Sequence, residues 1–335
     1  MPVERETLRV DAVRKTFRGE LGMAPKEVLH GVSFEAHRGE ILGFLGPNGT
    51  GKTTTIKIIL GLMRPDSGCV TIFGKNAGDR MALSRLGYLP ENPYFFPHLT
   101  LREFLHYCGS LSGIDSDLLG NRCDEMMTLT GLSESADRRL KGFSKGMTQR
   151  AGLAQAILHD PDLLILDEPF SGLDPLGRKM VRDIMLDLKK KGKTIFFSSH
   201  ILPDMEALCD RTVIIRDGMV VRSVSMDEVF RMAGSGTEVI ARGCSEDIIE
   251  GITDYIDRVA SRGRETFLHV KKQEFLRTVI KHLYNNGADV LKVVPDQLSL
   301  EEIFIREISG DPREPGMKAD HMSAVLPGGK EAHDE

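Results

Sequence analysis

The segment at residues 46–53, with the sequence GPNGTGKT, limits what this chain can fold into more than any other feature. The run before it, EILGFL at residues 40–45, is short and apolar, which is typical of a strand buried on both faces of a parallel sheet. Residues 52–63 change to helical spacing, and a turn at residues 64–68 ends that helix. The sequence therefore predicts a buried strand, a tight glycine loop and a helix in direct succession.

The rest of the first 230 residues repeats this alternation. Residues 163–166 and 194–198 are further apolar runs of the buried-strand type, and a helix is expected near residues 177–190 between them. Strands that alternate with helices predict an α/β domain with a mainly parallel sheet. Three kinds of segment complete the domain: alternating strands at residues 8–17 and 28–34, helices within residues 99–159, and a hairpin at residues 212–223.

The glycine loop has the pattern G-x-x-x-x-G-K-T in the strand-to-helix context that this pattern requires. Glycines let backbone N–H groups wrap around phosphates, and the positive end of the following helix points at them. Lys52 is expected to reach the β- and γ-phosphates, and the Thr53 hydroxyl to bind Mg²⁺. The alternative, a tight turn without a ligand, is disfavoured by the flanking elements. The predicted phosphate-binding residues are Gly46, Pro47, Asn48, Gly49, Thr50, Gly51, Lys52, Thr53 and Thr54.

Two carboxylates follow the apolar run at residues 163–166. Asp167 is positioned to hold Mg²⁺, directly or through water. Glu168 is the candidate general base for the attacking water. Because an acid after an apolar strand is common, both residues could instead be the solvated end of a strand. The phosphate loop in the same chain favours the catalytic interpretation.

Residues 237–309 form a second predicted unit after a flexible link at residues 233–236. The expected order of strand, helix, strand, strand, helix, strand matches the ferredoxin-like split motif, a small α+β fold. A short amphipathic helix is expected at residues 299–308. Proline, glycine and mixed charges dominate residues 311–335, which we interpret as a disordered tail.

Composition excludes several functional classes. The formal net charge of −5 gives no basic surface for nucleic acid and argues against binding of the chain itself to an anionic membrane. The five cysteines are scattered without a CxxC pair, so we expect no disulfide framework or zinc site, and a reducing cytosol fits. No apolar run reaches the roughly 20 residues that span a bilayer. The charged start of the chain leads us to expect no signal peptide.

Further motifs follow the glycine loop. Residues 143–150, with the sequence FSKGMTQR, precede a helix, where Ser144 taken alone could be an N-cap and no more. Ser171-Gly172-Leu173-Asp174 comes after the two carboxylates, and Ser198-Ser199-His200 comes after a buried strand. Five motifs in this order are far more specific than any one of them.

This order of motifs resembles the nucleotide-binding domain of ABC ATPases, and the resemblance covers residues 5–230. It implies a P-loop NTPase fold with a mainly parallel RecA-like core, an N-terminal antiparallel β-subdomain and a helical subdomain at residues 92–159. It also implies ATP and Mg²⁺ as the bound nucleotide and cofactor. In this family two such domains pair head to tail and enclose two ATP molecules.

The resemblance assigns roles to single residues. Ser144 and Gly146 would meet the γ-phosphate of the ATP held by the opposite subunit, and their place at the start of a helix gives this a physical basis. Asp174 would lie in the loop that crosses the interface, and His200 would contact the γ-phosphate and orient the water. Phe17 matches the aromatic position that stacks on adenine, with a core position in its strand as the alternative.

Two motifs depart from the family pattern. Glu91 falls where the family usually has a Gln that links the metal and the attacking water to the transmembrane partner. A carboxylate there can ligate Mg²⁺, but near a triphosphate it adds repulsion. Lys145 and Met147 replace the common Gly and Gln, and Lys145 adds positive charge beside the phosphate of the opposite subunit.

Tyr94, Phe95 and Phe96 lie between two prolines at the junction of the core and the helical subdomain. Three adjacent rings predict an exposed apolar patch, and such patches often mark partner sites. By resemblance, a cytoplasmic helix of a transmembrane subunit docks here. The alternative is that the rings fill the local core.

The first functional hypothesis is therefore the ATP-hydrolysing motor of a membrane exporter. ATP would close the dimer, hydrolysis at Glu168 would reopen it, and a separate transmembrane permease would use the movement. The partners would be a second copy or a homologue, together with that permease at the cytoplasmic face of the cell membrane. The closing sequence LSLEEIF at residues 298–304 resembles the C-terminal extension of subunits that serve ABC-2-type exporters.

Two other classes compete with this hypothesis. A soluble ABC ATPase of the translation type carries two nucleotide-binding domains. One of the repair type carries a long coiled coil between the phosphate loop and the motif that corresponds to residues 143–150 here. This chain shows one domain and no sustained heptads between residues 53 and 144. A phosphate-loop kinase or GTPase would leave the motif at residues 144–150 and His200 unexplained.

Overall fold

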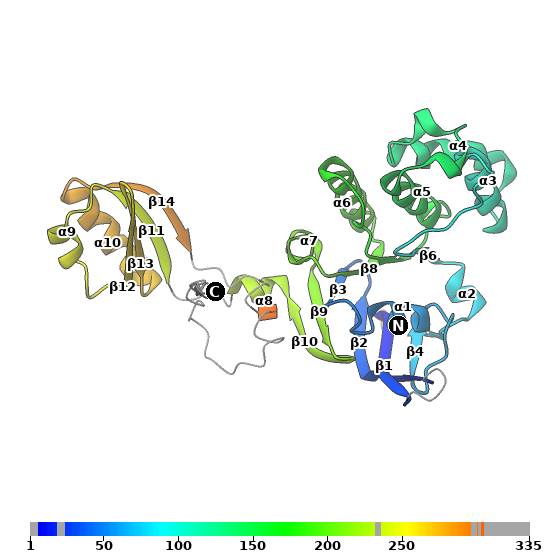
Figure 1. Ribbon diagram of the computed structural model, residues 1–335, viewed down its shortest axis with the longest axis horizontal. Coiled ribbons are helices and arrows are strands. Elements are labelled where there is room, and N and C mark those ends of the chain that lie inside the picture. The colour runs from blue at the N-terminus through cyan, green and yellow to red at the C-terminus, as the bar shows by residue number, and fades with distance from the viewer. Residues whose placement is uncertain (1–5, 19–23, 232–235, 296–299, 301–302, 305–335) are drawn as a thin grey trace, which may run out of the picture. The chain divides into compact units, whose positions relative to one another are not determined.

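The computed structural model describes residues 6–18, 24–231, 236–295, 300, 303 and 304, and these form two compact units (Figure 1). The first unit contains the described residues up to 231 together with residues 300, 303 and 304, and the second contains residues 236–295. Within these ranges, no helix is long and apolar enough to cross a membrane.

A six-stranded sheet forms the centre of the first unit (Figure 1). Its strands are β3 (Ile41–Leu45), β6 (Leu86–Leu89), β7 (Leu163–Asp167), β8 (Thr194–Ser199), β9 (Arg211–Arg216) and β10 (Met219–Ser225). The order is β10-β9-β3-β8-β7-β6, with β10 antiparallel to β9 and the other neighbours parallel. Every residue of β3, β7 and β8 is buried, which accounts for their nearly continuous apolar sequences.

A second sheet packs on the first. Its strands are β1 (Glu6–Phe17), β2 (Lys26–His37), β4 (Ser67–Ile72) and β5 (Lys75–Asn76), in the antiparallel order β2-β1-β4-β5. The two sheets share an apolar core with α1 (Lys52–Ile59). In this core the Phe34 ring lies 5.1 Å from the Phe44 ring and 5.4 Å from the Phe196 ring. This core holds the antiparallel sheet against the sheet that carries the glycine loop.

The other helices of the first unit pack on the parallel sheet or on one another. They are α2 (Arg80–Leu83), α3 (Leu101–Leu111), α4 (Ser116–Leu129), α5 (Lys145–Ile157), α6 (Pro175–Lys190), α7 (Leu202–Leu208) and α8 (Met226–Arg231), with 3₁₀ turns at Ser133–Ser135 and Leu140–Gly142. Helices α3, α4 and α5 gather into one group (Figure 1). Thr100 and Glu103 start α3 with a capping box, in which each side chain accepts a hydrogen bond from the other residue's N–H.

The second unit is a four-stranded antiparallel sheet with two helices. Its elements are β11 (Thr237–Arg242), α9 (Glu246–Glu250), β12 (Ile256–Arg262), β13 (Glu265–Val270), α10 (Gln273–Asn285) and β14 (Asp289–Pro295). The strand order is β12-β13-β11-β14. Ile252, Leu268, Val279 and Leu283 are among the residues that fill its separate core. This element order is the βαββαβ order of the ferredoxin-like split motif.

The described residues after β14 do not belong to the second unit, although the sequence predicts a unit at residues 237–309. Leu300 and Ile303 are buried in a core of the first unit, with Phe304 packed beside them, and all three are helical. The Leu300 N–H donates a hydrogen bond to Glu206 Oε1 of α7 at 2.7 Å. These apolar side chains are therefore buried by packing against residues of the first unit. The rest of the expected helix, the expected tail and most of the link lie outside the described residues.

Replacing Leu300 with alanine tests this assignment. Leu300 is 0% exposed, so Leu300→Ala should reduce the free energy of unfolding of the first unit by about 2–5 kcal/mol. Hydrogen exchange followed by mass spectrometry should become faster in α7 and stay unchanged in α10. Leu283→Ala, at an equally buried position of α10, is the matched control and should show the reverse. Faster exchange in α10 of Leu300→Ala would contradict the assignment.

Candidate active site

The glycine loop joins β3 to α1, and its geometry requires glycine at several positions. Gly49 and Gly51 have φ angles of 82° and 103°, which side chains disfavour. A Cβ on Gly46 would lie 2.5 Å from the Ile215 carbonyl oxygen, and one on Gly51 would lie 2.5 Å from a Leu29 methyl carbon. Gly51 begins α1 without a side-chain cap, so the first N–H groups of that helix can bind an anion.

Lys52 is buried at the base of the loop, with 6% of its surface exposed. Its Nζ donates hydrogen bonds to the carbonyl oxygens of Gly46 at 2.7 Å and Pro47 at 3.3 Å. The same Nζ lies 3.5 Å from Glu168 Oε1. These oxygens compensate the buried charge. A phosphate in the loop would meet this ammonium group and the N–H groups of α1 together.

Asp167 ends β7, and its carboxylate is a candidate ligand for a divalent cation. Ser198 Oγ donates to Oδ1 at 2.6 Å, whereas Oδ2 has no hydrogen-bond partner among the described residues. Burial raises the pKa of Asp167, and the hydroxyls of Ser198 and Thr53 act in the opposite direction. In the described part of the chain, His, Cys, Asp and Glu form no group of three that could hold a metal by themselves. A Mg²⁺ ion here would take Asp167, Thr53 and oxygens of the phosphates as ligands.

Glu168 lies between Lys52 and His200. Its φ of 49° is left-handed, which costs a residue with a side chain about 1 kcal/mol or more. Both of its carboxylate oxygens lie 3.0 Å from His200 Nδ1. Glu168 is 8% exposed, whereas the His200 side chain is 50% exposed. The strained backbone directs a nearly buried carboxylate between two basic groups, beside the phosphate loop.

Two buried polar residues organise this site, although the motifs assigned them no role. Ser198 Oγ donates to Asp167 and accepts a hydrogen bond from the Glu168 N–H at 3.0 Å, so one hydroxyl links both carboxylate residues. Gln149 Nε2 donates to the carbonyl oxygens of Glu168 at 3.4 Å and Pro169 at 3.3 Å. Both residues lie within recognised motifs. For Ser198, a polar residue directly after the buried apolar run Ile195–Phe197 was the signal that could have identified it.

A cavity of about 490 Å³ lies beside the glycine loop. Phe17, 38% exposed at the end of β1, and the exposed Glu91 line it together with Lys52 and Glu168. Its other lining residues are Val28, Asn48, Gly49, Gly51, Thr53 and Thr54. Behind the lining, Thr50 Oγ1 donates to the Pro47 carbonyl oxygen at 2.9 Å and stabilises the loop. One chain thus brings an aromatic ring, the glycine loop and the Glu168 carboxylate to the same cavity.

Ser144, Gly146 and Asp174, which the sequence places toward an opposite subunit, lie outside the lining of that cavity. Ser144 caps α5 by accepting a hydrogen bond from the Met147 N–H at 3.2 Å, and Gly146 follows in the first turn. Asp174 caps α6 by accepting from the Gly177 N–H at 2.7 Å. Ser144 and Asp174 are exposed. Within a single chain these groups start two helices at the surface and do not complete the site around Lys52.

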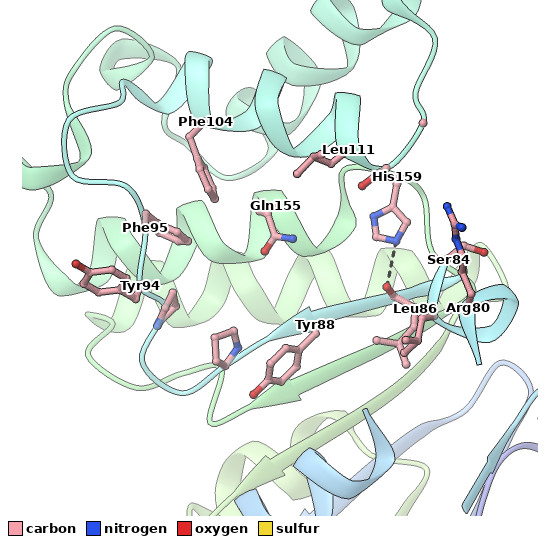
Figure 2. A pocket seen from close by; sticks show the side chains of 15 residues that line it. Arg80, Ser84, Leu86, Tyr88, Tyr94, Phe95, Phe104, Leu111, Gln155 and His159 are labelled. Atoms are coloured by element: carbon pink, nitrogen blue, oxygen red, sulfur yellow. Dashed lines mark hydrogen bonds between the residues drawn. The ribbon is translucent and has the colours of Figure 1, made fainter. Parts of the chain in front are cut away.

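A second cavity, of about 730 Å³, lies among α2, β6, α3 and α5 (Figure 2). Tyr94 on its rim is 90% exposed and the neighbouring Phe96 is 49% exposed. The ring of Phe95 instead packs 4.6 Å from the ring of Phe104 in α3. The three rings therefore do not form a single exposed patch. Phe95 fills the local core, while Tyr94 and Phe96 face outward.

Comparison with known proteins agrees with this geometry. The family model described as ABC transporter matches residues 29–171. An ABC transporter ATP-binding protein of Synechocystis is 40% identical over 92% of this chain and 86% of its own length, and the bacitracin transport ATP-binding protein BcrA of Bacillus licheniformis is 38% identical over 85% and 93%. The fold matches a dimeric structure of the ATP-binding cassette MJ0796 bound to ADP and phosphate, with a TM-score of 0.60, 22% identity and coverage of 65% and 98%. The chain belongs to the ABC transporter ATP-binding proteins.

Proposed function

We propose that this chain binds ATP with Mg²⁺, hydrolyses it, and so powers export through a separate transmembrane partner. The observation that carries the proposal is the position of Glu168, held between Lys52 and His200 beside the phosphate loop. Transport is supported by the similarity to the bacitracin transport ATP-binding protein of Bacillus licheniformis. Export is supported by the similarity to the Nod factor export ATP-binding protein I of Rhizobium, which is 31% identical over 88% of this chain and 94% of its own length. The proposed place of action is the cytoplasmic face of the cell membrane, reached through that partner.

The proposed chemistry follows from the charges in the cavity. Phosphates bind to the N–H groups of the loop and α1, while Phe17 stacks on the adenine ring. The triphosphate attracts Lys52, which then no longer neutralises Glu168. Glu168, still oriented by His200, accepts a proton from the attacking water. Mg²⁺ held by Thr53 and Asp167, with Glu91 as a further ligand, would neutralise charge on the phosphates.

The second half of the site is proposed to come from another subunit. Ser144 and Gly146 lie at the exposed start of α5, where N–H groups and the helix dipole favour an anion. Asp174 lies at the exposed start of α6, next to the interface that this arrangement creates. The dimer of MJ0796, which has the same fold, supports a paired arrangement. The proposed partner is a second copy or a homologue, bound head to tail.

The transmembrane partner is proposed to dock at the second cavity. Tyr94 and Phe96 expose apolar rings near an opening that is large enough for side chains of a helix. The loop that carries these rings follows β6 and also contains Glu91, which lines the nucleotide cavity. A docked helix would therefore contact a segment that ends at the nucleotide site.

Removing the base should separate ATP binding from turnover. Glu168→Gln preserves the shape of the side chain but cannot accept the proton, so turnover should fall by about 100-fold or more while ATP affinity is retained. An ATP-loaded dimer should accumulate in the presence of Mg²⁺. Phosphate release and light scattering measure the two effects. A variant that stays monomeric with ATP and Mg²⁺ would argue against the proposed closure.

Removing the ammonium group of Lys52 should weaken ATP binding itself. Lys52→Ala eliminates the buried ammonium that faces the phosphates, and ATP affinity should fall by about tenfold or more because a charge-assisted contact is lost. Lys57→Ala, on the exposed face of the same helix, is the matched control and should bind ATP like the native chain. Isothermal titration calorimetry gives both affinities. Equal affinities would refute the role of Lys52.

Polar replacement of the exposed rings tests the docking site. The double variant Tyr94→Ser and Phe96→Ser should reduce co-purification with the membrane partner and leave ATP affinity unchanged, because neither ring lines the nucleotide cavity. Leu62→Ser changes another exposed apolar residue, 70% exposed, and should not affect association. Undiminished co-purification of the double variant would reject docking at this cavity.

A further inference from the structure

Asp204 is a buried carboxylate that the proposed mechanism does not use. It lies in the first turn of α7, four residues after His200, and is 2% exposed. Two arginines of α6 face it: Arg178 Nη1 lies 3.7 Å from Oδ2, and Arg182 Nη2 lies 3.6 Å from Oδ1. Asp204 Oδ2 and Arg182 Nε have no hydrogen-bond partner in the described part of the chain. Charge attraction, and not a tight bidentate hydrogen bond, holds this cluster together.

Keeping the buried Asp204 carboxylate charged is unfavourable unless nearby positive charges compensate it. Burial raises the pKa of Asp204, and the charges of Arg178 and Arg182 oppose that rise. Glu168 also raises this pKa and His200 lowers it, so the field of the active site reaches Asp204. Apolar residues of similar size are often at least as stabilising as a buried ion pair. A role in stability alone is therefore a weak explanation for this one.

The cluster connects two segments that act in hydrolysis. Asp174 caps the start of α6, Arg178 lies on the first turn of this helix, and Arg182 lies one turn later. Helix α7 begins at Leu202, two residues after His200. The Nδ1 atom of His200 lies 3.0 Å from both carboxylate oxygens of Glu168. The pairs between Asp204 and the two arginines therefore link the loop proposed to cross the interface to the histidine that orients the base.

We propose that Asp204 is a positioning residue that, through Arg178 and Arg182, fixes α7 against α6 and thereby sets the orientation of His200 toward Glu168. The inference rests on the roles proposed above for Glu168 and His200. Asp204 does not line the nucleotide cavity, so it acts on catalysis and not on ATP binding. Catalytic groups tolerate little displacement, because proton transfer requires hydrogen-bond distance and alignment.

The first test separates kcat from KM. Asp204→Asn preserves the shape of the side chain and removes its charge, so kcat should fall by about 10- to 100-fold, as for a misplaced catalytic group, while KM for ATP stays within about twofold. Asp204→Glu keeps the carboxylate and should recover most of the turnover. Asp187→Asn, which breaks an exposed pair with Lys190 on α6, is the control and should leave kcat unchanged. Native turnover in Asp204→Asn would overturn the proposal.

A double-mutant cycle with His200→Ala tests the route of the effect. If Asp204 acts through His200, Asp204→Asn should lower kcat no further when His200 is already alanine, because the two losses share one cause. Additive losses would assign Asp204 a merely structural role and reject the proposal. The double variant Arg178→Gln and Arg182→Gln, at partly exposed positions, should reproduce the kcat loss if Asp204→Asn fails to fold. Full activity of that variant would equally reject it.

The cycle also distinguishes a failure of the catalytic role proposed for His200 from a failure of the positioning role proposed for Asp204. Native turnover in His200→Ala alone would show that His200 has no catalytic role, and this would overturn the proposed function of the pair and the inference with it. A large loss in His200→Ala together with native turnover in Asp204→Asn would leave the pair intact and reject the positioning role alone.

Discussion

The aligned carboxyl ends of β3, β7 and β8 determine where the reacting groups lie. Leu45 of β3 pairs with Ser199, and Asp167 of β7 pairs with Ser198, so the segments that follow these strands leave the sheet at one edge. The glycine loop, Glu168 and His200 are those segments. Burial on both faces fixes the register of these strands, because their apolar side chains fill two separate cores. The hydrophobic core therefore positions the polar site.

Charge compensation then organises the groups that meet at this edge. Lys52 is nearly buried and is satisfied by two carbonyl oxygens and by Glu168. Glu168 in turn is shared between Lys52 and His200. In the proposed function a triphosphate competes for Lys52, so nucleotide binding changes the charge around the base before any bond is broken. ATP binding and the activation of Glu168 then result from the same change in local charge.

Some features were predictable because their causes are local. The glycine positions of the loop depend on backbone conformation at those residues, and the capping role of Ser144 depends on the helix that starts beside it. Other features depend on distant partners. Phe95 is covered because α3 brings Phe104 over it, while its neighbour Tyr94 remains exposed. Leu300 joins the first unit because α7 offers buried surface and the Glu206 carboxylate.

The sequence by itself determined the phosphate loop, the two carboxylates after a buried strand, the order of motifs and the alternation that makes an α/β core. These follow from short-range patterns of glycine, charge and apolar spacing, which are written in consecutive residues. Only the tertiary structure decided that Ser198 joins Asp167 to Glu168, and that Asp204 meets two arginines of another helix. Those contacts join residues about 20 to 30 positions apart, and their geometry exists only once the packed sheet and helices bring the side chains together.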